Sequence, residues 1–353
     1  MANYDGKLKM NELFGGLCNM VISQQVFSDN ISVSSGQLVD MARVDGSLYG
    51  DTKLYYATDA LKSYDWVQDS EESLNLLATH RPPAPACQPL VIDKFRQIPL
   101  TLDDYMTKRA FADEGTFANF NSVLQGWIQD TKRVYDILNY NTFFGTAKSA
   151  TATENRSIVL AASLTSEDRA KTIAKSIADL LTEMTDISRD FNDYGFLRAY
   201  DKSAIKIIWN KSYVNEITKY DLPTIYHKDG LIDKFGEYTL NSRYFGTVNT
   251  VGTKGDGKLV RSLTEQEING NHYFPGDLIK TADTAPANTS YTVDSKVIAK
   301  VVVQMPPYMS AFETGTSFFN GRNLSTNYYL TFGRNTLDYL KNYPMITITE
   351  TAS

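Results

Sequence analysis

Residues 90–145 read LVIDKFRQIPLTLDDYMTKRAFADEGTFANFNSVLQGWIQDTKRVYDILNYNTFFG and decide the fold. Residues 90–98 have the β-branched, partly alternating pattern of a strand. After Thr116, side chains recur at helical steps and form one largely apolar stripe: Phe117, Phe120, Leu124, Trp127, Thr131, Tyr135 and Leu138. We expect this helix to end at Gly145 and to be roughly 40 Å long, since a helix rises about 1.5 Å per residue. It is long enough to act as a strut.

The preceding segment, residues 37–100, is expected to form an extended β-hairpin arm. Asp45-Gly46 and Gly50-Asp51 are strong turn signals. The sequence RPPAP at 81–85 favours a polyproline conformation and excludes a helix. Leu54 and Tyr56 alternate with polar residues, as in a half-buried strand. The arm has too few apolar residues to bury itself, so we expect its partners on a neighbouring subunit.

Five arm residues are the candidate contacts between subunits. They are two turn residues and three aromatic residues: Asp45, Gly46, Tyr55, Tyr56 and Trp66. Tyr and Trp combine a large contact area with a polar tip, which suits an interface. The same aromatic residues could equally pack locally, because tyrosine is also common in β-rich proteins.

The rest of the chain predicts a mixture of helices and strands. Thr101-Leu102-Asp103-Asp104 has the form of a helix cap, so we expect a helix to open at Thr101. A second long helix should follow the cap residue Thr165 and end at Gly195. Residues 220–295, rich in Gly, Asn, Thr and Asp, predict irregular β and loop structure. Further predicted elements are strands at 157–162, 204–209, 297–304 and 345–349 and a short helix at 336–340.

Composition sets broad limits on the class of protein. The chain has 353 residues, of which 42% are hydrophobic and 22% charged, enough for two or three subdomains with cores. A net charge of −6 without a Lys/Arg cluster argues against a dedicated nucleic-acid binder. Cys18 and Cys87 form no CxxC pattern, which favours a reducing compartment. We see no signal peptide and no membrane-spanning run.

The motifs that could carry chemistry are weak. Gly252–Lys258 fits GxxxxGK, but Leu259 stands where a phosphate-binding loop needs Ser or Thr, so a Gly-rich turn is the better interpretation. Adjacent carboxylates such as Glu167 and Asp168 fall at expected helix starts, where they favour the dipole. The histidines lack metal-site spacing: His80, His227 and His272. We therefore predict no catalytic residue, no cofactor and no metal.

The order of arm, strut helix, second helix and late strand resembles the major capsid protein of tailed double-stranded DNA bacteriophages, the HK97 fold. Arg43–Tyr56 looks like the start of that family's E-loop. Val91–Pro99, followed by Leu102–Tyr105, looks like the E-loop return into the spine helix. Ala204–Asn210 resembles a strand leading into the axial domain, and Glu313–Asn320 a late peripheral-domain loop.

The resemblance implies an α+β fold with five parts. They are an N-terminal arm (1–36), the E-loop (37–100), a peripheral domain (101–206) with its spine helix at about 116–144, an axial domain with a loop-rich insertion (207–296), and return strands of the peripheral and axial domains (297–353). It also implies a function without enzymatic activity. Copies would form hexamers and pentamers and close into an icosahedral shell around double-stranded DNA, without sequence-specific binding.

The implied partners are further copies of the chain, a scaffold protein and a portal protein, with no membrane. The shell would be part of the virion and would assemble in the host bacterial cytoplasm. Two alternatives stay open. One is another shell or tail protein, such as an encapsulin-like nanocompartment. The other is an enzyme of unrecognised family with a small-molecule site near residues 220–280.

Overall fold

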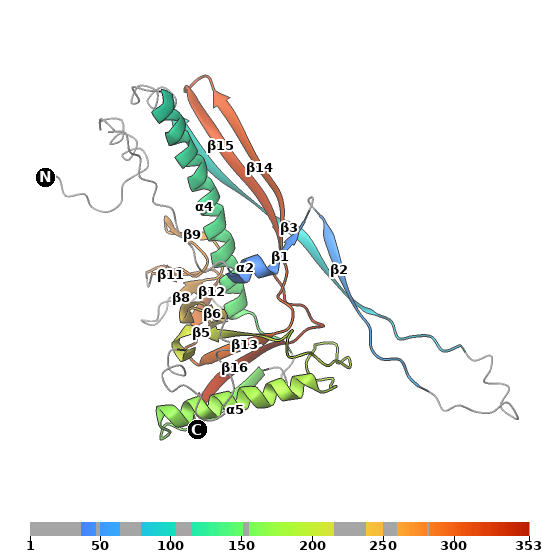
Figure 1. Ribbon diagram of the computed structural model, residues 1–353. Coiled ribbons are helices and arrows are strands. Elements are labelled where there is room, and N and C mark those ends of the chain that lie inside the picture. The colour runs from blue at the N-terminus through green and yellow to red at the C-terminus, as the bar shows by residue number, and fades with distance from the viewer. Residues whose placement is uncertain are drawn as a thin grey trace, which may run out of the picture.

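The structure, a computed structural model, describes residues 37–46, 50–63, 79–103, 114–150, 155–214, 238–249, 260–280 and 282–352. The molecule is elongated along one helix, and a β-hairpin runs beside that helix (Figure 1). A two-stranded ribbon leaves the body at an angle to this helix. A second long helix lies at the end of the molecule away from the hairpin tip (Figure 1).

Three α-helices have defined bounds: α2 (Gln37–Ala42), α4 (Glu114–Thr146) and α5 (Ser166–Thr185). The strut helix predicted from its apolar stripe is confirmed as α4, which is about 50 Å long at its 33 residues. The cap predicted for α5 is also confirmed, because Thr165 Oγ1 accepts a hydrogen bond from the Asp168 amide at 3.2 Å. The predicted end at Gly195 is wrong, because Asp186 already has an extended backbone.

The first sheet has the order β1-β14-β15-β3-β2. Its strands are β1 (Arg43–Asp45), β14 (Tyr308–Asn320), β15 (Ser325–Asn335), β3 (Ala86–Asp103) and β2 (Thr52–Ala57). One half of β3, residues 86–91, pairs antiparallel with β2, and the other half pairs antiparallel with β15. The predicted strand at 90–98 is thus confirmed as part of a longer one, which joins the arm to the hairpin beside α4.

Three local predictions in this part of the chain are wrong. Thr101–Asp103 continues β3 instead of opening a helix, because these residues pair with β15 and Leu102 is buried against α4 and β15. Residues 37–42 form helix α2 instead of an extended segment, because one side of it buries Leu38, Val39 and Ala42. Residues 336–340 form no helix; there, Thr336 Oγ1 and its amide donate to Asp93.

The second sheet has the order β4-β16-β13-β5-β6. Its strands are β4 (Asn155–Leu160), β16 (Met345–Ala352), β13 (Val297–Val302), β5 (Lys206–Asn210) and β6 (Tyr238–Leu240). The four strands predicted in these regions are confirmed, with shifted ends. Helix α5 covers one face of this sheet, and the end of α4 packs on the other. Every residue of β13 is buried, as expected for a strand covered on both faces.

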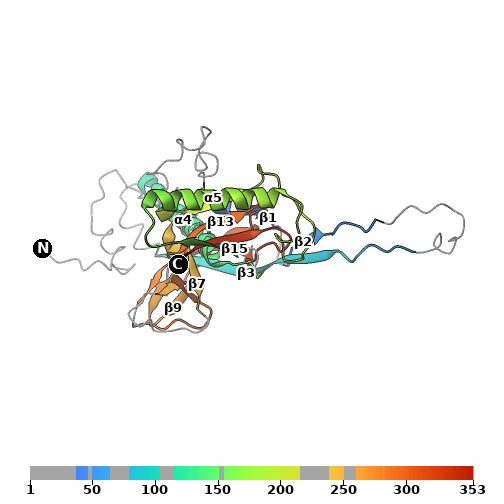
Figure 2. The same ribbon diagram turned by 90° about the horizontal axis from the view of Figure 1, so that it is seen from below.

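The remaining strands form a small β region between η3 (Ser242–Tyr244) and β13. Its four-stranded sheet has the order β11-β8-β12-β7, and β9 and β10 form a separate hairpin. The bounds are β7 (Gly246–Val248), β8 (Val260–Ser262), β9 (Gln266–Ile268), β10 (Asn271–Tyr273), β11 (Leu278–Ile279) and β12 (Ser290–Val293). Short strands and loops agree with the prediction of irregular β structure over its described part, while residues 220–237 and 250–259 lie outside the described residues. This region lies on the side of the body away from α5 (Figure 2).

The predicted division into peripheral and axial domains stays a prediction. Its boundary between residues 206 and 207 falls inside β5. The second sheet combines strands from 155–210 and from 297–352, with β6 at its edge. The second sheet therefore combines strands from the middle of the chain with strands from its C-terminal part.

A buried ion pair fixes α4 to the first sheet. The Asp136 side chain is 2% exposed and lies 3.0 Å from the Lys132 ammonium, one turn earlier on α4. The Tyr308 hydroxyl of β14 donates to the other carboxylate oxygen at 2.5 Å. Arg43 of β1 approaches from the surface at 3.9 Å. The carboxylate thus connects α4, β14 and β1.

A second buried cation fixes α4 to the second sheet. Lys300, in the middle of β13, is fully buried, and its ammonium donates to the Phe144 carbonyl at 2.6 Å and to the Ala147 carbonyl. Phe144 lies in the last turn of α4 and Ala147 directly follows the helix, where the helix dipole favours a positive charge. Burial nevertheless lowers the pKa of Lys300 to about 7, and Lys148 contributes in the same direction.

We expect Asp136→Ala to destabilise the folded chain by about 3–5 kcal/mol, because it leaves Lys132 buried without its counter-ion. The matched control is Glu183→Ala, which breaks the exposed pair with Arg156 and should cost less than about 1 kcal/mol. Urea unfolding of the unassembled chain measures both. Equal costs for the two variants would show that the buried pair is not a special support of α4.

Lys300 should make stability depend on pH in the alkaline range. Its folded pKa is about 7 and its unfolded pKa is about 10.4, so the unfolded chain binds more protons between these values. The free energy of unfolding therefore rises from pH 7 to pH 10, by at most about 1.4 kcal/mol per unit. Lys300→Met should remove this rise. The prediction fails if wild type and variant have parallel pH profiles.

Candidate subunit interface

The arm formed by β2 and the first half of β3 has one exposed apolar face. Leu54 pairs with Pro89, Tyr56 with Cys87 and Thr52 with Val91, and directly opposite residues point to the same side of a sheet. Leu54 is 50% exposed, Tyr56 64% and Val91 37%. Pro89 and Cys87 are exposed as well. We call these five residues, Leu54, Tyr56, Cys87, Pro89 and Val91, the outer face of the arm.

The opposite face of the arm is attached to the body. Leu90 and Ile92 are buried in one cluster with Met309, and Tyr55 packs against that cluster. Gln88 is bonded in both directions, because its amide nitrogen donates to the Tyr339 carbonyl at 2.9 Å and its oxygen accepts from the Lys341 amide at 3.0 Å. The body therefore holds this part of the arm in place and leaves the outer face uncovered.

A polar clip holds the arm where it leaves the body. Asp59 lies 2.7 Å from the Arg189 guanidinium and accepts the Leu197 amide hydrogen at 3.0 Å. Arg198 donates to the Thr58 carbonyl at 2.7 Å. The hydrogen bond from Arg189, with that from the Leu197 amide, lowers the pKa of Asp59 to about 2. The segment after α5 thus sets the direction in which the arm projects (Figure 2).

The five predicted contact residues fall in different places. Tyr56 lies on the outer face, and Tyr55 lies on the attached face. Asp45 belongs to β1, and the amide of Gly46 donates to the Ser310 carbonyl at 3.0 Å, so both lie at the first sheet and not at the arm's tip. Trp66 lies outside the described residues. An interface role for these five residues stays a prediction.

Gly46 lies close to the buried side chain of Ile92. A Cβ at this position would lie 2.4 Å from Cδ1 of Ile92, closer than any real contact. A larger residue here would require the Ile92 side chain to shift, whatever the role of Gly46 between subunits.

Sequence reasoning missed most of the outer face. It predicted a half-buried strand in which Leu54 and Tyr56 alternate with polar residues, and the structure places both on the exposed side of that strand. It did not single out Cys87, Pro89 or Val91 as contacts. The available signal was the alternation in both strands. The alternation identifies which residues share the exposed face only once the pairing of Leu54 with Pro89 is known.

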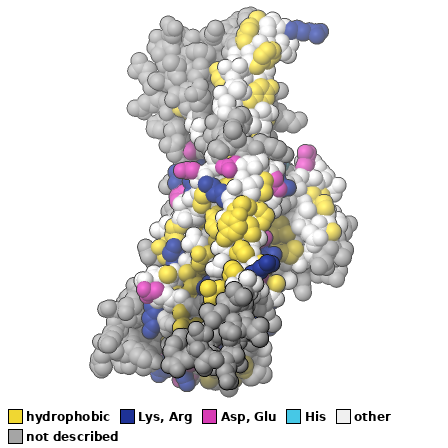
Figure 3. Space-filling view, turned by 90° about the vertical axis from the view of Figure 1, so that its right-hand side faces the viewer, with side chains coloured by type: hydrophobic (Ala, Val, Ile, Leu, Met, Phe, Trp, Pro, Cys, Tyr) yellow, Lys and Arg dark blue, Asp and Glu magenta, His cyan; other side chains and the backbone are white. Residues whose placement is uncertain are grey.

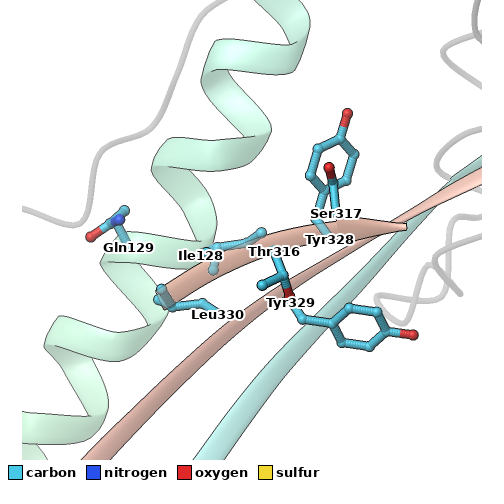
Figure 4. A pocket seen from close by; sticks show the side chains of 8 residues that line it. Ile128, Gln129, Thr316, Ser317, Tyr328, Tyr329 and Leu330 are labelled. Atoms are coloured by element: carbon cyan, nitrogen blue, oxygen red, sulfur yellow. The ribbon is translucent and has the colours of Figure 1, made fainter. Parts of the chain in front are cut away.

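A second exposed apolar group lies at the far end of the hairpin formed by β14 and β15. Phe318, Phe319 and Leu324 are all exposed there. Figure 3 shows hydrophobic side chains gathered on the side of the molecule from which the arm projects. Beside the hairpin, a cavity of about 290 Å³ lies between α4 and β15. Ile128 of α4 and Leu330 of β15 point toward one another across it, and Tyr329 points away from the helix (Figure 4).

The described residues contain no group of three or more His, Cys, Asp or Glu side chains placed to hold a metal ion. His272 lies 3.1 Å from Glu265 and against the ring of Phe274, and His80 is exposed. His227 and the Gly252–Lys258 motif lie outside the described residues. No helix in the described ranges is long and apolar enough to cross a membrane.

Comparison with known proteins identifies the fold. No protein-family model matches the chain, and no curated protein matches its sequence. Solved structures do match. The capsid structure of Staphylococcus phage Andhra has a TM-score of 0.64 at 10% identity, covering 94% of this chain and 88% of that one. A structure of the head fiber and inner core protein gp22 of native bacteriophage P68 has a TM-score of 0.58 at 11% identity, covering 99% and 92%.

The mature capsid of bacteriophage PhiM1 matches with a TM-score of 0.50 at 8% identity, covering 94% of this chain and 92% of that one. The matches extend over nearly the full length of both partners. The chain therefore has the mixed α+β fold seen in structures of phage capsids.

We expect Asp59→Asn to release the base of the arm, because the neutral amide loses the ion pair with Arg189. Protease cleavage within residues 58–85 should accelerate while thermal unfolding of the body stays the same. Acid should also release the arm, because protonation of Asp59 removes its charge and with it the ion pair with Arg189; the folded pKa of Asp59 lies below its ordinary value. The clip is intact above about pH 4 and is lost as the pH falls through about 2.

The matched control is Asp179→Asn, which neutralises an exposed carboxylate on α5. Cleavage in the arm should be as slow in this variant as in the wild type. If the Asp59 and Asp179 variants are cleaved at the same rate, the clip does not hold the arm.

Proposed function

We propose that this chain is the major capsid protein of a tailed double-stranded DNA bacteriophage and has the HK97 arrangement of arm, spine helix, peripheral domain and axial domain. Copies of it would close into the icosahedral shell around the genome. The observation that carries this proposal is the arm, which has one face attached to its own body and an apolar outer face that stays exposed to solvent in the described chain.

The outer face gives a physical reason to assemble. Fully burying an exposed Leu side chain gains about 1.5–3 kcal/mol. Leu54 and Tyr56 are 50% and 64% exposed, so covering what remains of both still favours a contact that removes them from water. In this proposal the arm of one copy lies on a different patch of the next copy, so that each copy holds its neighbour. A head-to-tail contact of this kind closes into rings when the rotation fits, as in pentamers and hexamers.

The rest of the fold suits a load-bearing subunit. Helix α4 is clamped to both sheets by Asp136 and Lys300, so force on the hairpin side passes to the second sheet. In the HK97 arrangement α4 is the spine helix, and the β region at 238–293 belongs to the axial domain. The net charge of −6 would limit adhesion to packaged DNA.

The proposal includes partners and a location. Other copies of the chain are the principal partner, and a scaffold protein and a portal protein would guide closure of the shell. The product would be part of the virion, assembled in the cytoplasm of the host bacterium. The chain would act without a cofactor and without catalysis.

The test is the double variant Leu54→Ser, Tyr56→Ser. Both side chains are exposed in the single chain, so its folding and thermal stability should not change. Loss of their burial should raise the concentration needed for assembly by roughly tenfold to a hundredfold. Electron microscopy and light scattering of the full chain, expressed with a candidate scaffold if required, measure the yield of shells.

The control is Leu278→Ser, which removes an exposed apolar side chain from β11, away from the arm. Shells from the control but not from the double variant support the proposal. Normal shells from the double variant contradict the role of the arm. Tubes in place of closed shells from the wild type would favour a tail protein.

A further inference from the structure

A polar cavity of about 270 Å³ lies away from the arm, where four segments meet. Gln37 comes from the start of α2, Asn141 from α4, and Lys211 from the residues directly after β5. Thr239 of β6, Asn241 before η3 and Arg243 of η3 add further polar groups to the lining. The segments are far apart in the sequence, so the fold alone creates this site.

Asn141 in the wall of the cavity is not satisfied. Its side chain is 1% exposed, and neither its Oδ1 nor its Nδ2 has a hydrogen-bond partner. Nearly all buried polar groups in folded proteins are hydrogen-bonded, so an amide with both ends unpaired requires an explanation. A ligand in the cavity could supply the missing partner.

The charge of the lining indicates what kind of ligand fits. Lys211 and Arg243 are cations, and no Asp or Glu occurs among the described residues that line the cavity. Arg243 is held in position, since its guanidinium lies 4.6 Å from the ring centre of Tyr244 and donates to the Tyr244 hydroxyl at 2.5 Å. Arg243 is thus a fixed cation, and Lys211 is a second, exposed cation of the lining. Together with the amide and hydroxyl groups of the lining they suit an oxyanion.

We propose that this cavity binds an oxyanion of the phosphate class. The Asn141 amide would donate to one oxygen at the wall, and Lys211 and Arg243 would balance the charge at the mouth. This inference does not depend on the capsid function. The phosphate could be free in solution or part of the backbone of a nucleic acid, and the chemistry of recognition is the same for both.

The experiment uses the full wild-type chain and three ligands at equal ionic strength: sodium phosphate, a short DNA duplex and sodium chloride. Calorimetric titration should show saturable binding of phosphate, and thermal unfolding should shift upward with phosphate but not with chloride. Saturable binding of the duplex, competing with phosphate, would identify a backbone phosphate as the source. Binding of phosphate alone would identify a free anion.

Two variants test the residues. The double variant Lys211→Ala, Arg243→Ala should weaken phosphate binding at least tenfold. The control Arg322→Ala removes an exposed cation from the turn between β14 and β15 and should bind phosphate as the wild type does. Asn141→Leu should fold, because it removes an unpaired polar group from a buried position, and should lose the phosphate-dependent shift. The proposal is overturned if neither ligand binds saturably, or if binding is equal in the double variant and the wild type.

Discussion

The hydrogen-bond ladder of β3 is the constraint on which the other parts of the structure depend. This strand pairs with β2 in the arm and with β15 in the hairpin beside α4, so the arm and the strut share one continuous backbone element. The two pairings meet at Ile92, which is hydrogen-bonded to Gly50 and Asp51 on the arm side. Ile92 also pairs with Asn335 of β15, so a bend at this residue would break ladder hydrogen bonds. The exposed outer face is therefore presented at a direction that the body fixes, and the Asp59 clip reinforces that direction.

Helix α4 connects the two sheets through charges that are buried rather than exposed. Asp136 meets Tyr308 of the first sheet, and Lys300 of the second sheet meets the last carbonyls of the helix. Removing one partner of a buried charge is costly, so these two contacts allow little sliding of the helix. A subunit with one rigid axis and a fixed arm suits an assembly in which each copy positions the next.

The sequence predicts the strongly periodic elements and fails where distant segments decide. The stripes of α4 and α5 and the apolar run of β13 are strong local signals, and all three elements form. The cap pattern at Thr101 is equally local, but pairing with β15 overrides it. The side of the arm that would face solvent depends on packing against Met309, far along the chain, and the cavity at Asn141 depends on four segments. No local pattern contains that information.

Cys87 on the outer face provides the most direct measurement of the central claim, that another copy covers this face in the assembled particle. It is a free, exposed cysteine opposite Tyr56. With Cys18→Ser, Cys87 becomes the one remaining thiol of the chain. Its rate of alkylation can then be compared in unassembled chains and in purified particles. The account predicts rapid reaction in the unassembled chain and strong protection in the particle. Equal rates in the two states would contradict it.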